Sequence, residues 1–236
     1  MEALQQSAGY IDRLVLLQEA GIRALASAAS QEFAEICDDF PSVRLAELCT
    51  RKPQSGIYKP EEYRGRGVPM GNMGELFGND VISREVEMER VELDETELER
   101  YRLTSDDLLF GRRSVVLEGA GRCVLVGVQD EPLVFESSVL RVTLDSEKID
   151  NRFVFEWLRS PFGHQQIRRI VTFTTVSGVA GSDVARLPVP LPPIEVQRRI
   201  ANRLSGLREK VDIPAERANE ARTLARETLR RALEAS

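Results

Sequence analysis

The chain has 236 residues, of which 42% are hydrophobic and 30% charged, which is enough apolar material to bury a core. The formal net charge is −6, no apolar run approaches the roughly 18–20 residues that cross a bilayer, and the first residues lack the basic-then-apolar order of a signal peptide. Three widely spaced cysteines and one histidine argue against a disulfide framework, a zinc site and most histidine-dependent catalysis. Taken together, these features lead us to expect a cytoplasmic protein with no membrane partner.

The first predicted element is a long helix over residues 10–40, which Pro41 ends. Residues that recur near helical spacing define one face: Ile11, Leu14, Leu17, Gly21, Leu25, Ala28, Phe33 and Ile36. Small residues at 24–29 would let a second helix approach closely. We therefore expect residues 1–41 to form a helical spacer.

The middle of the chain, residues 42–191, has frequent glycines and short runs rich in β-branched and aromatic residues. These runs predict strands at 114–117, 122–128, 133–135 and 138–144, with a hairpin connection at Gly119–Gly121. A short helix is expected over Asn151–Ser160, ended near Pro161. The pattern predicts one α+β domain.

Acidic residues are concentrated in one segment of this domain. Residues 84–107 contain ten acids and four arginines, an excess that equals the net charge of the whole chain. The rest is neutral on balance and can hold basic patches. We expect the acidic segment to face away from nucleic acid or toward a basic partner.

A second long helix is predicted from Pro192-Pro193 to the end of the chain, residues 192–236. Its apolar and small residues follow heptad steps: Ile200, Leu204, Leu207, Val211, Pro214, Ala218, Ala221, Ala225, Thr228 and Ala232. Pro214 should kink or interrupt this helix. The expected fold is α+β: one mixed domain flanked by two long helices that pair as an antiparallel coiled coil. An ordinary helical appendage is the alternative.

Five segments in order resemble the specificity subunit of type I DNA restriction-modification systems: Val43–Cys49, Tyr63–Met73, Leu103–Ser114, Phe135–Val142 and Leu187–Ile200. The last is the most specific, because Leu187-Pro188-Val189-Pro190-Leu191-Pro192-Pro193 followed by Gln197 is similar to the family's junction between a recognition domain and a spacer helix. Asp106 stands where that family usually has glycine, and one globular domain is present where two are usual.

The resemblance implies a target-recognition domain that binds double-stranded DNA and reads half of a bipartite site. It implies an adenine-N6 methyltransferase partner, a restriction/translocase subunit and, for a half-length chain, a second copy of itself. It implies no catalysis and no cofactor on this chain, with S-adenosylmethionine carried by the methyltransferase.

Candidate DNA contacts are residues whose side chains suit bases and phosphates and that lie in turn-rich segments. They are Lys52, Lys59, Arg64, Arg66, Asn72, Arg112, Arg113, Ser114, Arg168, Arg169, Thr172, Thr174, Thr175 and Ser177. Each has a plainer alternative: Arg112 and Arg113 could balance Asp106 and Asp107, residues 172–177 could form an ordinary strand, and Asn72 could end one.

Two other functions fit the same organisation. One is a recognition subunit of a different methyltransferase-based defence complex, with the same role on DNA. The other is a coiled-coil scaffold whose central domain binds protein. Salt-dependent binding to duplex DNA distinguishes the scaffold from both DNA-reading alternatives.

Overall fold

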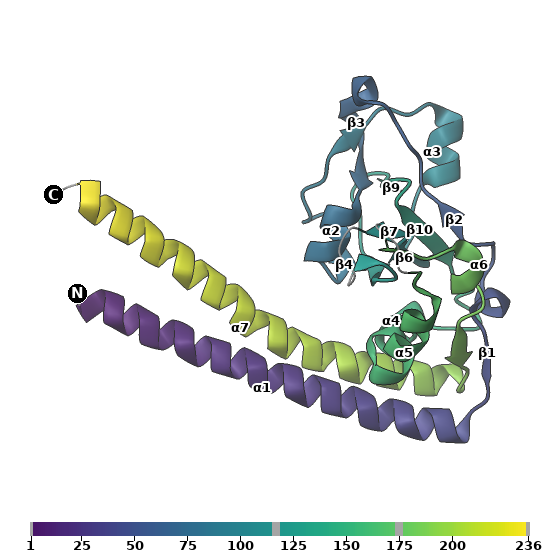
Figure 1. The fold of residues 1–236 in the computed structure, drawn as a ribbon, viewed down its shortest axis with the longest axis horizontal. Helices are drawn as coiled ribbons and strands as arrows, with labels where there is room; N and C mark the ends of the chain where they lie inside the picture. Colours follow the sequence, from purple (N-terminus) through teal and green to yellow (C-terminus); the bar gives the residue numbers. More distant parts are fainter. Residues whose placement is uncertain (1, 115–118, 173–176, 235–236) are drawn as a thin grey trace. The chain divides into compact units, whose positions relative to one another are not determined.

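The computed structural model describes residues 2–114, 119–172 and 177–234, and it divides into two compact units (Figure 1). Unit 1 holds the chain up to Glu32 and from Arg199 onward, and unit 2 holds Phe33–Arg198. Helix and strand content together make the protein α+β, as predicted. Among the described residues, no helix is both long enough and apolar enough to cross a membrane.

The helices alternate with short strands along the chain. The α-helices are α1 (Glu2–Asp39), α2 (Met73–Gly78), α3 (Glu95–Tyr101), α4 (Asn151–Arg159), α5 (Pro161–Ile170), α6 (Gly181–Val184) and α7 (Ile194–Glu234), with 3₁₀ turns at Leu45–Leu48 and Glu61–Tyr63. The strands are β1 (Ser42–Arg44), β2 (Gln54–Ser55), β3 (Arg64–Gly71), β4 (Val81–Ile82), β5 (Arg90–Val91), β6 (Asp107–Gly111), β7 (Arg113–Ser114), β8 (Cys123–Val126), β9 (Val134–Phe135), β10 (Val139–Thr143), β11 (Ser177–Gly178) and β12 (Pro188–Pro190).

The main sheet of unit 2 has five strands in the order β2-β10-β6-β8-β4. Its three central strands, β6, β8 and β10, are buried along their whole length and pair antiparallel, whereas β4 joins β8 in parallel. Burial on both faces fits their mostly apolar sequences, and the polar residues that they do contain, Asp107, Arg141 and Thr143, are buried and hydrogen-bonded. The strands predicted at 122–128, 133–135 and 138–144 are confirmed as β8, β9 and β10.

A smaller sheet has the order β5-β3-β9 and contains a bulge in β3. Arg64 and Val68 both align with Val91, so Gly65-Arg66-Gly67 is extruded from the strand. Both glycines have positive φ, +83° at Gly65 and +92° at Gly67. Only Gly67 also lies against backbone, because a Cβ there would come within 2.2 Å of the Val91 carbonyl oxygen.

This difference predicts unequal costs for two identical substitutions. Gly67→Ala is expected to lower the free energy of unfolding by about 2–4 kcal/mol, because it combines an unfavourable φ with a clash. Gly65→Ala is the matched control and is expected to cost only about 1–2 kcal/mol, since its Cβ would meet open space. Urea unfolding of both variants measures the difference, and equal costs would contradict this account of the bulge.

The predicted hairpin at Gly119–Gly121 is wrong in its partners. In the described residues β7 pairs with β11, and β8 pairs with β6 and β4. The Gly121 N–H donates to the Gly111 carbonyl (2.8 Å), and Gly111 N–H donates to the Arg122 carbonyl (2.8 Å), so this turn extends the β6–β8 ladder. The rest of the strand predicted at 114–117 lies outside the described residues.

The helices α4 and α5 cover unit 2 and have clear start signals. Asp150 caps α4 by accepting from the backbone N–H of Arg152 and Phe153, and Ser160 caps α5, which has Pro161 in its first turn. The Phe33 ring packs on α4, 5.6 Å from the Phe153 ring. The helix expected at 151–160 is confirmed, but α5 was not predicted because its apolar residues are few.

The start of α7 is fixed by one buried amide. Gln197 is fully buried; its Oε1 accepts from the Asp150 N–H (2.8 Å) and its Nε2 donates to the Pro192 carbonyl (2.8 Å). Nearby, the Trp157 indole donates to the Pro188 carbonyl (3.3 Å), on the strand that pairs with β1. The junction sequence therefore joins β12, α4 and the first turn of α7 within unit 2.

Unit 1 consists of the remaining lengths of α1 and α7. A Cβ on Gly21 would come within 2.9 Å of Val211 Cγ2, and Glu32 forms an ion pair with Arg203. Within this unit, α1 and α7 therefore run in opposite directions (Figure 1). α7 continues through Pro214 without interruption. Leu17, predicted on the apolar face of α1, is 60% exposed within the single chain.

Candidate nucleic-acid interface

The pairing of β7 with β11 brings two groups of predicted DNA contacts together. Ser114 aligns with Ser177 and Arg113 with Gly178, across more than sixty residues of sequence. The Arg112 carbonyl accepts from the Val179 N–H (3.0 Å), and Thr172 forms a bridge with Gly178. Arg112 is half-buried and Arg113 is exposed. Thr174 and Thr175 lie outside the described residues.

The last turn of α5 adds two more basic side chains beside this pair of strands. Arg168 and Arg169 are both exposed, and α5 ends two residues before Thr172. Positive side chains at a helix C-terminus also interact favourably with the helix dipole. Arg169 donates to the Gln166 side chain (3.2 Å). Arg112 and Arg113, the exposed Thr172 and the basic end of α5 are therefore brought into one region, which we call the β7–β11 surface, whereas the predicted contacts Ser114 and Ser177 are buried.

A cavity of about 550 Å³ adjoins this surface and contains residues that the sequence did not point to. Its lining combines apolar and cationic side chains: Ala120, Gly121, Arg122, Cys123, Leu158, Arg159, His164, Ile167, Arg168 and Val171. Asp80 accepts from both Arg122 (3.2 Å) and Arg159 (2.5 Å), which fixes those two guanidinium groups. No local motif predicts this cluster, because its members come from β8, α4, α5 and the segment before β4.

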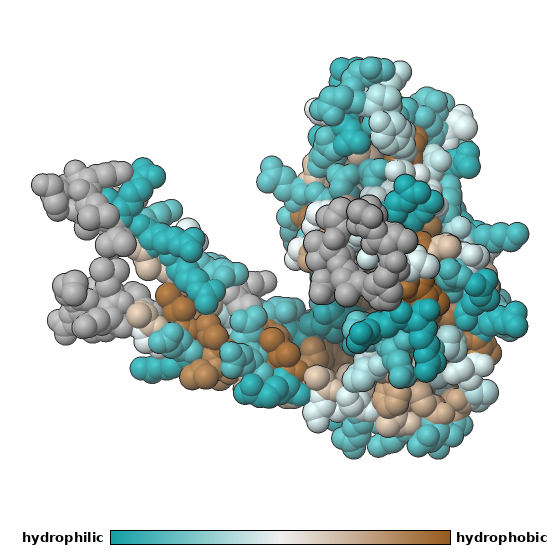
Figure 2. Space-filling model, in the orientation of Figure 1, coloured by the Kyte–Doolittle hydropathy of each residue, from teal (hydrophilic) through white to brown (hydrophobic). Residues whose placement is uncertain are grey.

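The first group of predicted contacts is placed differently, in the β5-β3-β9 sheet. Acidic partners neutralise three of its members: Lys59 pairs with Glu97 (2.6 Å), Arg64 with Glu89 (2.7 Å) and Arg66 with Glu92 (2.6 Å). Residues of the acidic segment thus pair with these three basic side chains. Figure 2 shows a mainly hydrophilic surface over β3 and α3. Lys52 is exposed, outside these pairs.

Asn72 lies at the junction between β3 and α2. Its backbone N–H donates to Glu75 Oε2 (2.8 Å), and its side-chain amide donates to the Met70 carbonyl (3.3 Å). These bonds begin α2 with the usual reciprocal arrangement of a helix start. The plainer interpretation of Asn72, a residue that ends a strand, accounts for these contacts.

The plainer interpretation of the arginine pair receives less support. Asp107 is fully buried, and its carboxylate accepts from the Thr104 N–H (2.8 Å) and from the Thr143 hydroxyl. Its recorded partners are these threonines, whereas the Arg112 side chain donates to the Ser137 carbonyl (3.2 Å). Asp107 therefore does not balance these arginines, whereas the other acid of that alternative, Asp106, is exposed.

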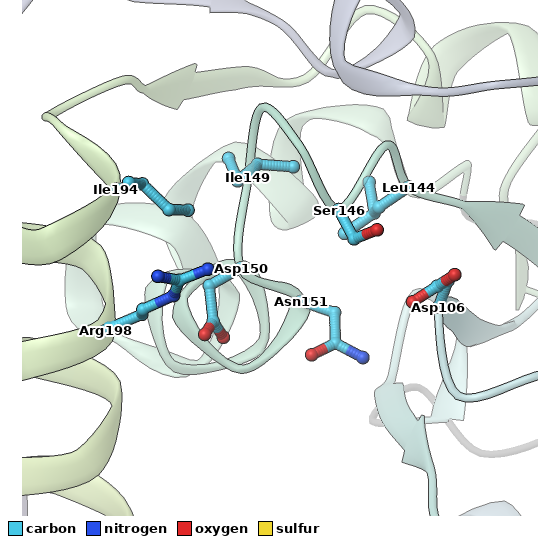
Figure 3. A pocket seen from close by; sticks show the side chains of 8 residues that line it. All are labelled: Asp106, Leu144, Ser146, Ile149, Asp150, Asn151, Ile194 and Arg198. Carbon is cyan, nitrogen blue, oxygen red and sulfur yellow. The ribbon is translucent and has the colours of Figure 1, made fainter.

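A second, smaller pocket of about 130 Å³ lies elsewhere in unit 2 (Figure 3). It is lined by Asp106, Leu144, Ser146, Ile149, Asp150, Asn151, Ile194 and Arg198. The Asp150 carboxylate caps the N-terminus of α4, and Arg198 forms an ion pair with Glu195 (3.2 Å). Two carboxylates in so small a volume disfavour phosphate, so this pocket is not part of the candidate interface.

Two described cysteines are poorly suited to nucleophilic chemistry. Burial raises the pKa of the Cys49 thiol to about 11 and raises that of Cys123 further, so neither forms a thiolate nucleophile readily at neutral pH. Within residues 2–114, 119–172 and 177–234, no three histidine, cysteine or acidic side chains are grouped to hold a metal ion. The β7–β11 surface instead offers the guanidinium groups of exposed arginines, which contact phosphates and base edges.

Comparison with known proteins gives the same result at the level of family and fold. The chain is 26% identical over 186 residues to the type I restriction enzyme MjaVIII specificity subunit of Methanocaldococcus jannaschii and 27% identical over 184 residues to the EcoKI specificity subunit of Escherichia coli. Each alignment covers 77% of this chain, but only 42% and 39% of those relatives. The chain thus spans about two-fifths of the length of the curated relatives it matches.

Solved structures share the fold across nearly the whole chain. A chain from a type I restriction-modification system, studied for complex assembly and conformational transition, matches with a TM-score of 0.58 at 16% identity over 98% of this chain and 58% of that one. The HsdS subunit from Thermoanaerobacter tengcongensis matches with a TM-score of 0.56 at 14% identity over 97% of this chain and 56% of that one. The model of the type I restriction modification DNA specificity domain matches residues 38–222. Because that match takes in the sheets of unit 2, the β7–β11 surface and the junction into α7, the chain belongs to the family of type I restriction modification DNA specificity domains.

Proposed function

We propose that this chain recognises double-stranded DNA and serves as a specificity subunit, or half of one, in a type I restriction-modification system. The observation that carries the proposal is the β7–β11 pairing, which brings Arg112 and Arg113 to the segment that holds the exposed Thr172 and the basic end of α5. Membership of the family supports the same role. In this proposal the chain carries no chemistry of its own.

The residue types at this surface suit two kinds of DNA contact. Arginine can donate two parallel hydrogen bonds to O6 and N7 of guanine, which discriminates this base in the major groove. Serine and threonine hydroxyls and further arginines can bind phosphate oxygens, which fixes the register of the protein on the duplex. Arg113 is more exposed than Arg112, and we assign it to contact with a base or a phosphate. We assign Arg168 and Arg169 to contact with the DNA backbone.

The two long helices would supply the spacing between half-sites. We infer that α1 and α7 pair as an antiparallel coiled coil; the Gly21–Val211 approach and the Glu32–Arg203 ion pair support this arrangement. Apolar side chains stay exposed on both helices: Leu16, Leu17, Ile22, Ile213 and Leu224. They are suited to contact a further helical partner, such as an adenine-N6 methyltransferase subunit or a second copy of this chain.

The length of the chain bears on how a complete subunit would form. Since the curated relatives are more than twice as long as the matched region, a second recognition domain is needed to read both halves of a bipartite site. Two copies related by two-fold symmetry would read two identical half-sites. The methyltransferase would bring S-adenosylmethionine, and a restriction/translocase subunit would complete the assembly.

Fluorescence anisotropy with labelled duplex pools tests the proposal. We expect the purified chain to bind duplex DNA with an affinity that falls steeply as salt rises, because phosphate contacts release counterions. Selection from a randomised pool should recover a short half-site. A chain that shows no salt-dependent binding at low ionic strength would instead fit the protein-binding scaffold.

A further inference from the structure

The turn between β9 and β10 lies directly behind the arginine pair of the β7–β11 surface. The Ser138 carbonyl accepts from the backbone N–H of Arg112 (2.7 Å) and from that of Arg113 (3.3 Å). The neighbouring Ser137 carbonyl accepts from the Arg112 guanidinium (3.2 Å). Both the backbone and one side chain of the arginine pair are thus held by two consecutive carbonyl groups.

One carboxylate fixes the shape of that turn. Glu136 accepts from the Ser137 hydroxyl, from the Ser138 hydroxyl and from the Ser138 backbone N–H (2.7 Å). Burial alone would raise the pKa of Glu136, but the hydrogen bonds from Ser137 and Ser138 outweigh it and lower the pKa below its usual value. The side chain is therefore ionised at neutral pH, and its bonds to the turn are charge-assisted.

The same turn is tied to rigid parts of unit 2 on its other side. The Glu136 N–H donates to the Gly71 carbonyl at the end of β3 (3.1 Å), and the Val139 N–H donates to the Glu136 carbonyl at the start of β10 (2.9 Å). β9 and β10 are fully buried strands. Glu136 thus connects the core to the start of β7 through a turn with few remaining degrees of freedom.

We propose that Glu136 is a positioning residue for DNA binding, whose carboxylate holds the Ser137–Ser138 turn so that Arg112 and Arg113 are presented in one orientation. The inference rests on the proposed function, because it assigns Glu136 a role at that same surface. Preorganised donors lose less conformational entropy when they bind, which is the physical source of the expected gain in affinity.

The sign of one substitution distinguishes positioning from simple electrostatics. Glu136 is a negative charge beside a surface that would face phosphates, so long-range repulsion alone predicts tighter DNA binding when the charge is removed. Positioning predicts the reverse. Glu136→Gln keeps the size of the side chain but removes the charge that accepts three hydrogen bonds, and we expect it to weaken duplex binding about threefold to tenfold.

The experiment measures duplex affinity of the full chain by anisotropy, with the melting temperature recorded for each variant. Glu147→Gln is the matched control, because it removes one exposed acidic charge from a turn away from β7. We expect this control to leave affinity unchanged or slightly higher. If Glu136→Gln bound DNA as tightly as wild type or tighter, the positioning role would be overturned.

A double-substitution cycle separates positioning from general damage to the fold. In the Arg112→Gln/Arg113→Gln background, Glu136→Gln should have no further effect on affinity, because it acts through those two side chains. An equal loss in both backgrounds would show a merely structural role. Ser138→Ala provides a milder second variant, expected to weaken binding about twofold to threefold with the charge retained; an unchanged affinity would count against the turn.

The wild-type measurement keeps this inference distinct from the proposed function. If the wild-type chain failed to bind duplex DNA at low salt, the proposed function would fail and the role of Glu136 with it. If the wild-type chain bound DNA and lost affinity through Arg112→Gln/Arg113→Gln but not through Glu136→Gln, only the positioning inference would fail.

Discussion

Replacement of Arg112, Arg113, Arg168 and Arg169 together by glutamine is expected to weaken binding to duplex DNA by about 100-fold to 10,000-fold near physiological salt. These four side chains are the basic groups that β7 and α5 bring beside Thr172 and Ser177. Each lost base contact would cost about 1–3 kcal/mol, and each lost phosphate contact would lower the slope of log affinity against log salt by about one. Anisotropy titrations over a series of salt concentrations measure both quantities.

The control for this experiment removes the same charge from a different part of unit 2. Arg64, Arg66, Arg84 and Arg90 each pair with an acidic residue, namely Glu89, Glu92, Asp130 and Glu131. Their replacement by glutamine changes the net charge equally, so any general electrostatic effect is matched. We expect only a small loss of affinity. An equal loss in both variants would move the interface to the β5-β3-β9 sheet or make it non-specific.

Single variants resolve which arginine reads sequence. If Arg113 contacts a base, Arg113→Gln should relax specificity at one position of the half-site and leave the others unchanged. If it contacts phosphate, affinity should fall alike for all sequences. Selection from a randomised duplex pool with each variant decides between the two.

Local sequence signals were sufficient for elements that combine apolar runs with a start signal or flanking turns. The strands β8, β9 and β10 have runs of apolar residues between turns, and α4 follows the capping residue Asp150. The proline-rich junction also predicted the start of α7. The helix α5 (Pro161–Ile170) was not predicted, because it has few apolar residues and its position depends on contact with the rest of unit 2.

The candidate interface could be predicted only in part, because its geometry depends on pairs that are distant in sequence. Residue types singled out Arg112, Arg113, Thr172 and Ser177, yet nothing near them predicts that β7 pairs with β11. The same limit applies to Asp80, which reaches Arg122 and Arg159 from before β4. Conversely, basic residues in a turn-rich segment looked available for DNA, but the acidic segment folds back onto Lys59, Arg64 and Arg66.

The largest loss of stability is expected from Arg141→Ala, about 3–5 kcal/mol of the free energy of unfolding. Arg141 is 1% exposed, and its guanidinium donates to the carbonyls of Arg102 (2.9 Å) and Arg100 (3.2 Å) and to the Gln54 side chain. It also lies 5.3 Å from the centre of the Phe135 ring. Truncation would leave a cavity and three part-buried acceptors without their donor.

The contacts of Arg141 explain why a smaller side chain would not serve in its place. The carbonyls of Arg100 and Arg102 end α3, so one guanidinium satisfies that helix terminus and fastens it to β10 and β2. Burial lowers the pKa of Arg141, against the attraction of Asp107, but a guanidinium keeps its charge and needs donors placed in a planar fork. Arg141→Lys should therefore recover only part of the loss, since a single ammonium reaches fewer of these acceptors.

Urea unfolding measures the loss in free energy of unfolding for Arg141→Ala, Arg141→Lys and Arg84→Ala, which we expect to decrease in that order. Arg84 is exposed and pairs with an exposed Asp130, so its removal should cost less than about 1 kcal/mol. A loss below about 1 kcal/mol for Arg141→Ala would contradict the assigned network. The folded fraction of Arg141→Lys should still bind DNA like wild type, because the acceptors of this guanidinium lie in α3 and β2 and none belongs to the β7–β11 surface; stability and recognition thus depend on different arginines of the same unit.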